Sequence, residues 1–149
     1  MLSNVEIVER LQDIGHYKDS PEAEADYARL MSSDLVIIEP ACIPYGGRFQ
    51  GAQEIARFDE IYHSCWTHTE HRVLRYISEG EYVACYVELD ATSRKTGRTV
   101  HTRVSEWWRV VDGKVVEIEI FYYDPVAVLD VLEAEPRRES SSPSLELEK

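Results

Sequence analysis

The stretch Asp34-Leu-Val-Ile-Ile-Glu-Pro40 predicts a buried strand that ends on an acid. Its central residues are apolar and mostly β-branched, which favours a strand. Pro40 has no N–H to donate and therefore ends the strand. Burying a carboxylate is costly, so Glu39 lies either at the mouth of a cavity, where its pKa rises, or turned towards water. In a cavity, a raised pKa makes a carboxylate a useful base near neutral pH.

Three helices are predicted around this strand, two before it and one after it. The first has a helical spacing of apolar residues over 5–14. The second begins with Ser20 at the N-cap, followed by Pro21 and by acids in its first turn. After the turn Ile43-Pro-Tyr-Gly-Gly47, residues 52–63 have the spacing of a third helix.

The rest of the chain predicts long antiparallel strands. These strands span 73–78, 82–91, 99–111 and 114–123. Asp112-Gly113 is a hairpin signal, and Asp124-Pro125 starts a short last helix. We therefore predict an α+β fold. In it, a curved antiparallel sheet is wrapped by three N-terminal helices and forms a cone around an internal pocket.

Composition indicates one domain with a sizeable core. The chain has 149 residues, a hydrophobic fraction of 44% and a net charge of −12. This charge argues against binding to nucleic acid or to anionic membrane surfaces. Three cysteines without paired spacing predict free thiols in a reducing, cytoplasmic compartment. We predict a domain over 1–133 and a disordered, dispensable tail, rich in acids and serine, over 134–149.

Three segments carry a family resemblance. They are the strand that ends in Glu39-Pro40, the loop Ile43-Pro-Tyr-Gly-Gly-Arg-Phe-Gln-Gly51, and the closing strand Gly113-Lys-Val-Val-Glu-Ile-Glu-Ile-Phe-Tyr-Tyr-Asp124. They resemble the NTF2-like superfamily, which includes ketosteroid isomerases and SnoaL-like polyketide cyclases. The resemblance implies the cystatin-like α+β cone. It implies no single activity, because this fold carries isomerases, cyclases, hydrolases, dehydratases and binding proteins.

The resemblance also implies roles for two acids and a tyrosine. In the isomerase branch the base is the acid before the proline, which is Glu39 here. A second acid stays protonated and donates to an oxyanion, and the frame Ser105-Glu-Trp-Trp-Arg-Val110 places Glu106 in that role. A tyrosine on the first helix is a further donor, and Tyr17 lies nearest to its position. The pocket wall is expected to hold the aromatic residues Phe58, Tyr62, Trp108 and Tyr122.

Each of the two acids also has a purely structural alternative. Glu39 could cap the turn that follows it or pair with Arg48. Glu106 could form a cross-strand ion pair with Arg72 or Arg75. Both alternatives would leave the acids without a catalytic role.

Other polar side chains are predicted to lie outside the pocket. Period two places Glu117 and Glu119 on the outer face of the sheet, although an acid on this strand acts in SnoaL-like cyclases. His63, His68 and His71 lack the spacing of metal ligands, and we predict no metal site.

We expect a cofactor-free enzyme that performs acid–base chemistry on a small apolar molecule with a carbonyl or epoxide group. Isomerisation, cyclisation, dehydration and hydrolysis are the candidate reactions. The alternative is a non-catalytic ligand-binding protein or a dimeric assembly module. The strand face with Arg103, Ser105, Trp107 and Arg109 predicts a homodimer, since Trp and Arg are enriched at interfaces.

Overall fold

The computed structural model describes residues 1–17 and 19–138, and these ranges contain four helices and six strands. In chain order they are α1 (Asn4–Tyr17), α2 (Pro21–Leu30), β1 (Met31–Glu39), β2 (Gly47–Gln50), α3 (Gly51–Cys65), β3 (Trp66–Glu79), β4 (Tyr82–Ser93), β5 (Thr99–Val111), β6 (Lys114–Tyr122) and α4 (Pro125–Leu132). The predicted α+β class is confirmed, and the order of elements is the predicted one apart from the additional strand β2.

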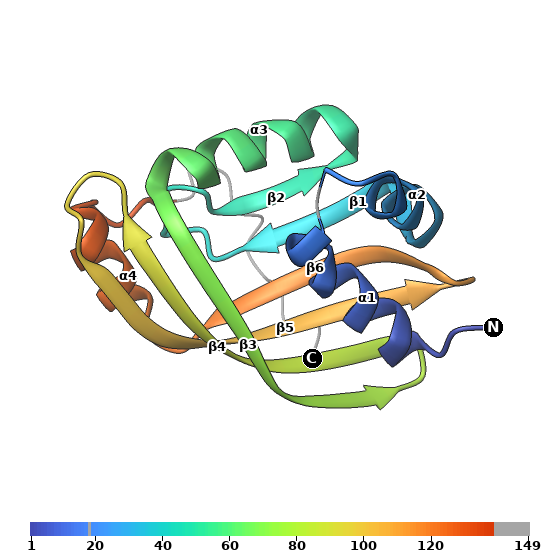
Figure 1. Ribbon diagram of the computed structural model, residues 1–149. Coiled ribbons are helices and arrows are strands. Elements are labelled where there is room, and N and C mark those ends of the chain that lie inside the picture. The colour runs from blue at the N-terminus through green and yellow to red at the C-terminus, as the bar shows by residue number, and fades with distance from the viewer. Residues whose placement is uncertain (18, 139–149) are drawn as a thin grey trace, which may run out of the picture.

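The six strands form one curved sheet in the order β2-β1-β6-β5-β4-β3. Strands β1 and β6 pair in parallel, whereas the other neighbours are antiparallel. Helices α1 and α3 cover the concave side, α2 packs beside α1 and β1, and α4 lies at one end (Figure 1). The predicted sheet wrapped by three N-terminal helices is therefore confirmed. Within the described residues, every helix is too short or too polar to cross a membrane.

Local signals start α2 and α4 as predicted. Ser20 Oγ accepts a hydrogen bond from the N–H of Ala23 at 3.1 Å, and Pro21 takes the first helical position. In the same way, Asp124 Oδ1 accepts from the N–H of Ala127 at 3.0 Å at the start of α4. These caps satisfy N–H groups that the first turn of a helix leaves without partners.

Two parts of the sheet differ from the sequence prediction. Strand β2 pairs Phe49 with Ile37 of β1, whereas the sequence indicated only a turn, because four residues give too short a pattern to detect. Gly47, with a φ of 119°, lets the chain turn into this strand. Strand β3 begins at Trp66 rather than at Val73. Its first half is mostly polar and exposed, so it lacks the apolar alternation that marks a strand.

A bulge in β6 decides which of its side chains face the core. The register shifts between Arg109 and Val110 of β5, so that Val110 pairs with Val115 and Arg109 pairs with Glu117. The extra residue allows both Val115 and Ile118 to be buried. Strict alternation along the strand would place Val115 on the outer face beside Glu117, and the bulge prevents this.

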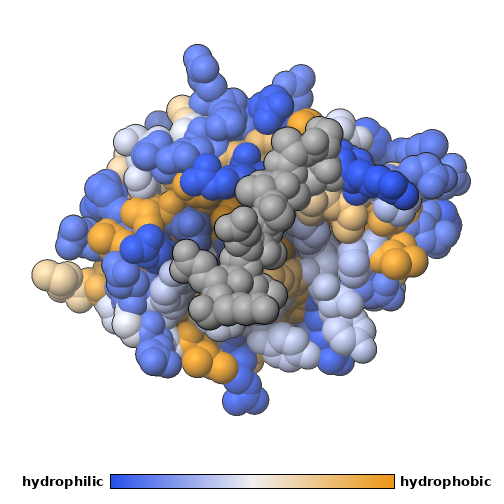
Figure 2. Space-filling model, turned by 180° about the vertical axis from the view of Figure 1, so that it is seen from behind, coloured by the Kyte–Doolittle hydropathy of each residue, from blue (hydrophilic) through white to orange (hydrophobic). Residues whose placement is uncertain are grey.

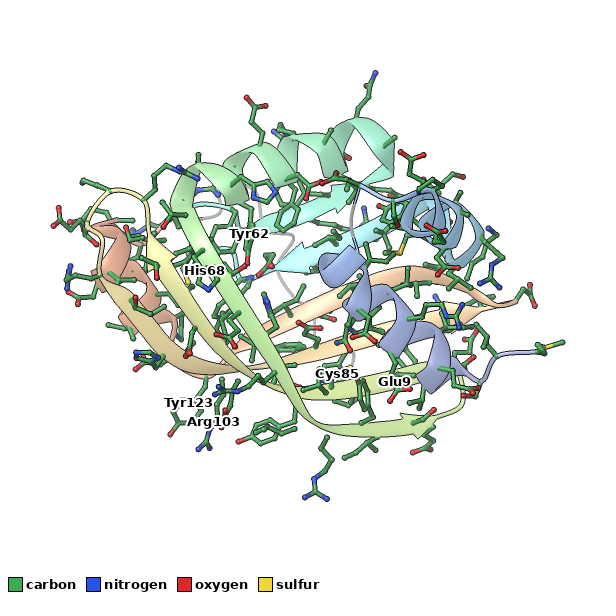
Figure 3. All side chains as sticks on the ribbon, in the orientation of Figure 1. Glu9, Tyr62, His68, Cys85, Arg103 and Tyr123 are labelled. Atoms are coloured by element: carbon green, nitrogen blue, oxygen red, sulfur yellow. The ribbon has the colours of Figure 1, made fainter. Side chains whose placement is uncertain are left out.

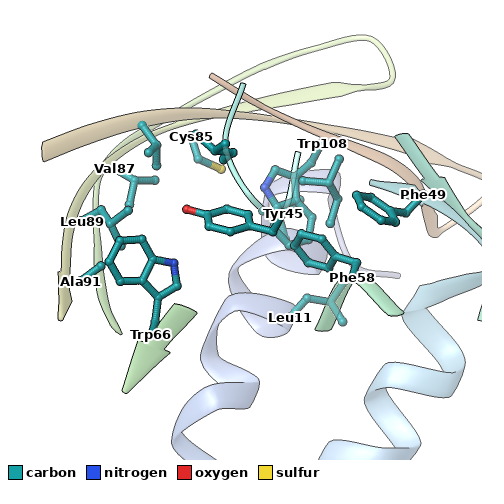
Figure 4. Packing of buried hydrophobic residues seen from close by; sticks show 14 of the residues in the cluster. Leu11, Tyr45, Phe49, Phe58, Trp66, Cys85, Val87, Leu89, Ala91 and Trp108 are labelled. Atoms are coloured by element: carbon teal, nitrogen blue, oxygen red, sulfur yellow. The ribbon is translucent and has the colours of Figure 1, made fainter. Parts of the chain in front are cut away.

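Tyr45 lies at the centre of the core although it belongs to a turn. Its side chain is fully buried. Its ring makes edge-to-face contacts with Phe58 and Trp66, with ring centroids 6.4 Å and 6.3 Å apart (Figure 4). The turn is also tight, because a Cβ on Gly46 would lie 2.0 Å from the carbonyl oxygen of Pro40. The turn after β1 is therefore folded closely over the core.

The chain beyond α4 is bound to this same turn. The N–H of Arg137 donates to the carbonyl oxygen of Cys42 at 2.9 Å. Its Nη1 lies within hydrogen-bond distance of the carbonyl oxygens of Ile43 (3.3 Å), Pro44 (3.0 Å) and Gly46 (3.3 Å). Ala134 and Arg137 thus contact the domain, where we expected a tail to begin. Residues 139–149 of the expected tail lie outside the described part of the chain.

Truncation after Ala134 is therefore expected to lower the midpoint of thermal unfolding, whereas truncation after Arg138 keeps these hydrogen bonds and should have a smaller effect. Each net hydrogen bond contributes about 0.5–1.5 kcal/mol, and each kcal/mol moves the midpoint by about 2–4 °C in a domain of this size. Circular dichroism melts of both truncations and of Arg137→Ala measure the effect. Equal midpoints for all of them would show that Arg137 does not stabilise the turn.

Candidate active site

The concave side of the sheet encloses a cavity of about 180 Å³, which we call the inner cavity. Tyr62 projects from α3 into the space between this helix and the sheet (Figure 3). Apolar and aromatic side chains line the cavity together with two carboxyl groups. The lining residues are Ile37, Glu39, Phe58, Tyr62, His71, Leu89, Val104, Glu106, Trp108, Ile118, Ile120 and Tyr122. All the site residues predicted from the sequence line it except Tyr17, whose side chain lies outside the described part of the structure.

Glu39 is buried at the end of β1. It is 7% exposed, and its Oε2 has no hydrogen-bond partner among the described residues. Burial raises its pKa well above the usual range for a glutamate, and the charge of Glu106 raises it further. Arg48 instead donates from Nη1 to Gln50 Oε1 at 2.9 Å. The alternative of a Glu39–Arg48 ion pair is therefore absent from the described part of the chain.

Glu106, on β5, has a different environment from Glu39. Its Oε2 accepts hydrogen bonds from Trp108 Nε1 at 2.9 Å and from Gln12 Nε2 at 3.3 Å. Donated N–H groups stabilise the charged form of a carboxylate. Arg72 forms its ion pair with Glu88 rather than with Glu106. The two carboxyl groups thus share one cavity. Oε2 of Glu39 has no hydrogen-bond donor among the described residues, whereas Oε2 of Glu106 has two.

Gln12 of α1 is a site residue that the sequence analysis missed. The hydroxyl of Tyr76 donates to Gln12 Oε1 at 2.6 Å, which leaves the amide N–H groups to face Glu106. Gln12 thus contributes a donor from the first helix to Glu106, a role different from that of the oxyanion donor that the family resemblance places at Tyr17. A signal was available, because Gln12 follows the fully buried Val8 by four residues and so shares its helix face.

A pair of tyrosine hydroxyls provides a second polar group at the inner cavity. The Oη atoms of Tyr45 and Tyr122 lie 2.9 Å apart, and Tyr122 lines the cavity. Burial raises the pKa of both hydroxyls, and the charge of Glu39 raises both further. They therefore stay neutral and can donate hydrogen bonds. The local sequence places Tyr45 in a turn and gives no sign that it reaches the core.

A second hollow of about 370 Å³, the outer chamber, adjoins the inner cavity. Its lining residues are Gln12, Asp13, His71, Val73, Tyr76, Glu106 and Trp108. Because His71, Glu106 and Trp108 line both hollows, Glu106 stands at their junction. We predicted His71 to lie outside the pocket; its side chain is exposed, but it belongs to β3, where it pairs with Leu89 of β4, and it lines both hollows.

The remaining candidate side chains lie elsewhere. Glu117 and Glu119 are on the outer face of the sheet beside Trp107 and Phe121, as predicted. Within residues 1–17 and 19–138, no three His, Cys, Asp or Glu side chains gather so as to hold a metal ion.

The family model of the SnoaL-like domain matches residues 22–118. The chain belongs to this family. A comparison with curated proteins found no match.

Solved structures of SnoaL-like and NTF2-like proteins share the fold. An NTF2-like protein of unknown function from Burkholderia pseudomallei is 22% identical, with a TM-score of 0.77 and a match over 90% of this chain and 100% of that chain. A candidate SnoaL-like polyketide cyclase from a Jannaschia species is 21% identical, with a TM-score of 0.71 over 89% and 93% of the two chains. A hypothetical protein with a ketosteroid isomerase-like fold from Catenulispora acidiphila, solved with trimethylamine, is 13% identical, with a TM-score of 0.66 over 87% and 93%. The predicted superfamily is therefore confirmed.

Proposed function

We propose that this protein is an enzyme that moves a proton on an uncharged carbonyl compound bound in the inner cavity. Glu106 is the base that removes a proton from the carbon next to the carbonyl. Glu39, in its neutral form, donates a hydrogen bond to the oxygen on which negative charge develops. The contrast between two carboxyl groups that line one cavity carries this proposal.

Opposite environments separate the roles of the two acids. Glu39 is buried, has an oxygen without a donor, and has a pKa that burial and the charge of Glu106 raise well above its usual range. Glu106 accepts two N–H donors, which favour its carboxylate. Where the surroundings of two titratable groups push their pKa values apart, one group supplies the acid and the other the base. This assignment reverses the roles that the family resemblance implied.

The chemical step balances without a further reactant. The C–H bond breaks, its electron pair forms a C=C bond, the carbonyl π electrons move to oxygen, and the proton goes to Glu106. The neutral carboxyl of Glu39 and the hydroxyl of Tyr122 are the nearby donors for the resulting enolate oxygen. Return of the proton to a different carbon gives isomerisation, and attack of the enolate on a second carbonyl gives cyclisation.

Hydrogen exchange at carbon tests the proposal without the natural substrate. In heavy water, the protein is expected to accelerate replacement of the hydrogens next to the carbonyl of cyclohexanone by deuterium, as followed by proton NMR. Glu106→Gln should remove this acceleration. Glu117→Gln, a matched change on the outer face of the sheet, should leave it intact.

The alternative role has its own outcome in the same experiment. Saturable binding of cyclohexanone without accelerated exchange would contradict the enzyme and support a non-catalytic ligand-binding protein. The relative from Catenulispora acidiphila was solved with trimethylamine, which supports small-molecule binding in proteins of this fold.

We also propose that the outer face of the sheet joins two copies of the chain. It exposes Trp107 and Phe121, which are 44% and 51% exposed. The molecule seen from behind shows apolar patches separated by hydrophilic residues (Figure 2). Light scattering is expected to give a dimer for the wild type and a monomer for Trp107→Glu, because a buried unpaired carboxylate is costly. A wild-type monomer at micromolar concentration would contradict this proposal.

A further inference from the structure

We propose that the ligand is a molecule of two parts without an anionic group, with a single apolar ring in the inner cavity and a polar substituent in the outer chamber. The inference rests on the proposed function only for the direction of the ring carbonyl, towards Glu39. The arguments on size, connection and charge do not depend on catalysis.

The size of the inner cavity limits the first part of the ligand. Its volume is about 180 Å³, and an engineered protein cavity of about 150 Å³ holds one benzene molecule. One six-membered ring with a carbonyl group therefore fills it. Sites for larger ligands usually have about 300–1,000 Å³, so the rest of a larger ligand must lie outside the inner cavity.

The junction of the two hollows determines where that remaining part lies. The outer chamber adds about 370 Å³ and shares His71, Glu106 and Trp108 with the inner cavity. A substituent on the ring that points towards Glu106 therefore enters the space between α1 and β3. There it meets the amide of Gln12 and the hydroxyl of Tyr76, and polar groups of this kind favour a polar substituent.

Charge in the two hollows excludes an anionic ligand. Glu39 and Glu106 line them, no described lining residue is Lys or Arg, and His71 alone among these residues can become cationic. A ligand carboxylate or phosphate would lose its hydration without gaining a strong counter-charge. A ligand ammonium would lose hydration in the apolar inner cavity, but in the outer chamber it would lie beside the Glu106 carboxylate. The lining therefore argues against an anionic substituent, whereas a neutral or cationic one fits the outer chamber.

Five cyclohexanone-type probes test these points by saturation-transfer NMR at neutral pH. They are cyclohexanone itself, three derivatives with hydroxymethyl, carboxylate or aminomethyl opposite the carbonyl, and the cage ketone adamantanone. The hydroxymethyl and aminomethyl derivatives are expected to bind tighter than cyclohexanone, and the dissociation constant of the carboxylate derivative should be at least about tenfold higher than theirs. Adamantanone should bind more weakly than cyclohexanone, because its cage exceeds the inner cavity.

Variants of β3 test the outer chamber separately. Val73→Trp fills it and should weaken binding of the hydroxymethyl derivative about tenfold more than binding of cyclohexanone. Val73→Phe provides the same test with a smaller side chain if the Trp variant does not fold. Leu74→Trp is the matched control, since Leu74 is 48% exposed and lines neither hollow.

Each result decides one part of the proposal. Equal affinity for the carboxylate derivative would overturn the argument on charge, and tight binding of adamantanone would overturn the size limit. Equal losses for both ketones in Val73→Trp would overturn the role of the outer chamber. The expected binding order without hydrogen exchange would contradict the proposed function and still support this inference.

Discussion

Glu39→Gln is expected to raise the midpoint of thermal unfolding at pH 8. The pKa of Glu39 in the folded protein lies well above its usual value because the side chain is buried and because Glu106 is near. In the unfolded chain a glutamate loses its proton near its usual pKa of about 4.3. As pH rises from there through the folded-state pKa, the free energy of unfolding falls, and the full loss is present above the folded-state pKa. Glutamine cannot ionise and therefore removes this loss.

Acidic pH provides the control for this prediction. Well below the unfolded pKa, Glu39 is protonated in both states, so the wild type and the variant should unfold at similar midpoints. The difference should grow as pH rises, by about 2–4 °C for each kcal/mol. Glu117→Gln should not show this pattern, because Glu117 lies on the outer face. A lower midpoint for Glu39→Gln at pH 8 would instead reveal a stabilising charge interaction, and the neutral role of Glu39 would be wrong.

Residues on regular elements could be placed from the sequence. Glu39 ends an apolar run, and Glu106 alternates with Val104 and Trp108, so period two puts these side chains on the concave face. Phe58 lies on the inward face of α3 and reaches the same cavity. These placements need only local periodicity, which the sheet and the helix preserve.

Contacts between distant segments could not be placed in this way. Gln12 and Glu106 are 94 residues apart, and Arg137 meets Gly46 across 91 residues. Periodicity indicates which face a side chain takes, and it gives no information on which distant group completes its hydrogen bonds. Tyr45 was missed for a related reason, because turns have no periodicity and the tight fold of this turn follows from its packing.

Glu106→Gln is expected to slow hydrogen exchange more than Glu39→Gln does. Removal of a general base lowers a rate by about 10²–10⁴-fold. Glutamine at position 39 keeps an N–H donor for the developing oxyanion, so its effect should be smaller than the roughly 10²–10³-fold loss seen when such a donor is removed. The amide oxygen in Glu106→Gln can still accept from Trp108 and Gln12, and the fold should remain intact. Exchange rates of both variants with cyclohexanone, compared with Glu117→Gln, measure the difference.

The double variant shows whether the two acids act on each other. The charge of Glu106 is the second cause of the raised pKa of Glu39, after burial. In the Glu106→Gln background that pKa should fall but stay above its usual value, so Glu39→Gln should stabilise the protein less at pH 8 than it does in the wild type. The difference between the two stabilisations is the interaction energy of the pair. Equal stabilisation would mean that the acids do not interact, and a larger rate loss for Glu39→Gln than for Glu106→Gln would assign the base to Glu39, as the family resemblance implies.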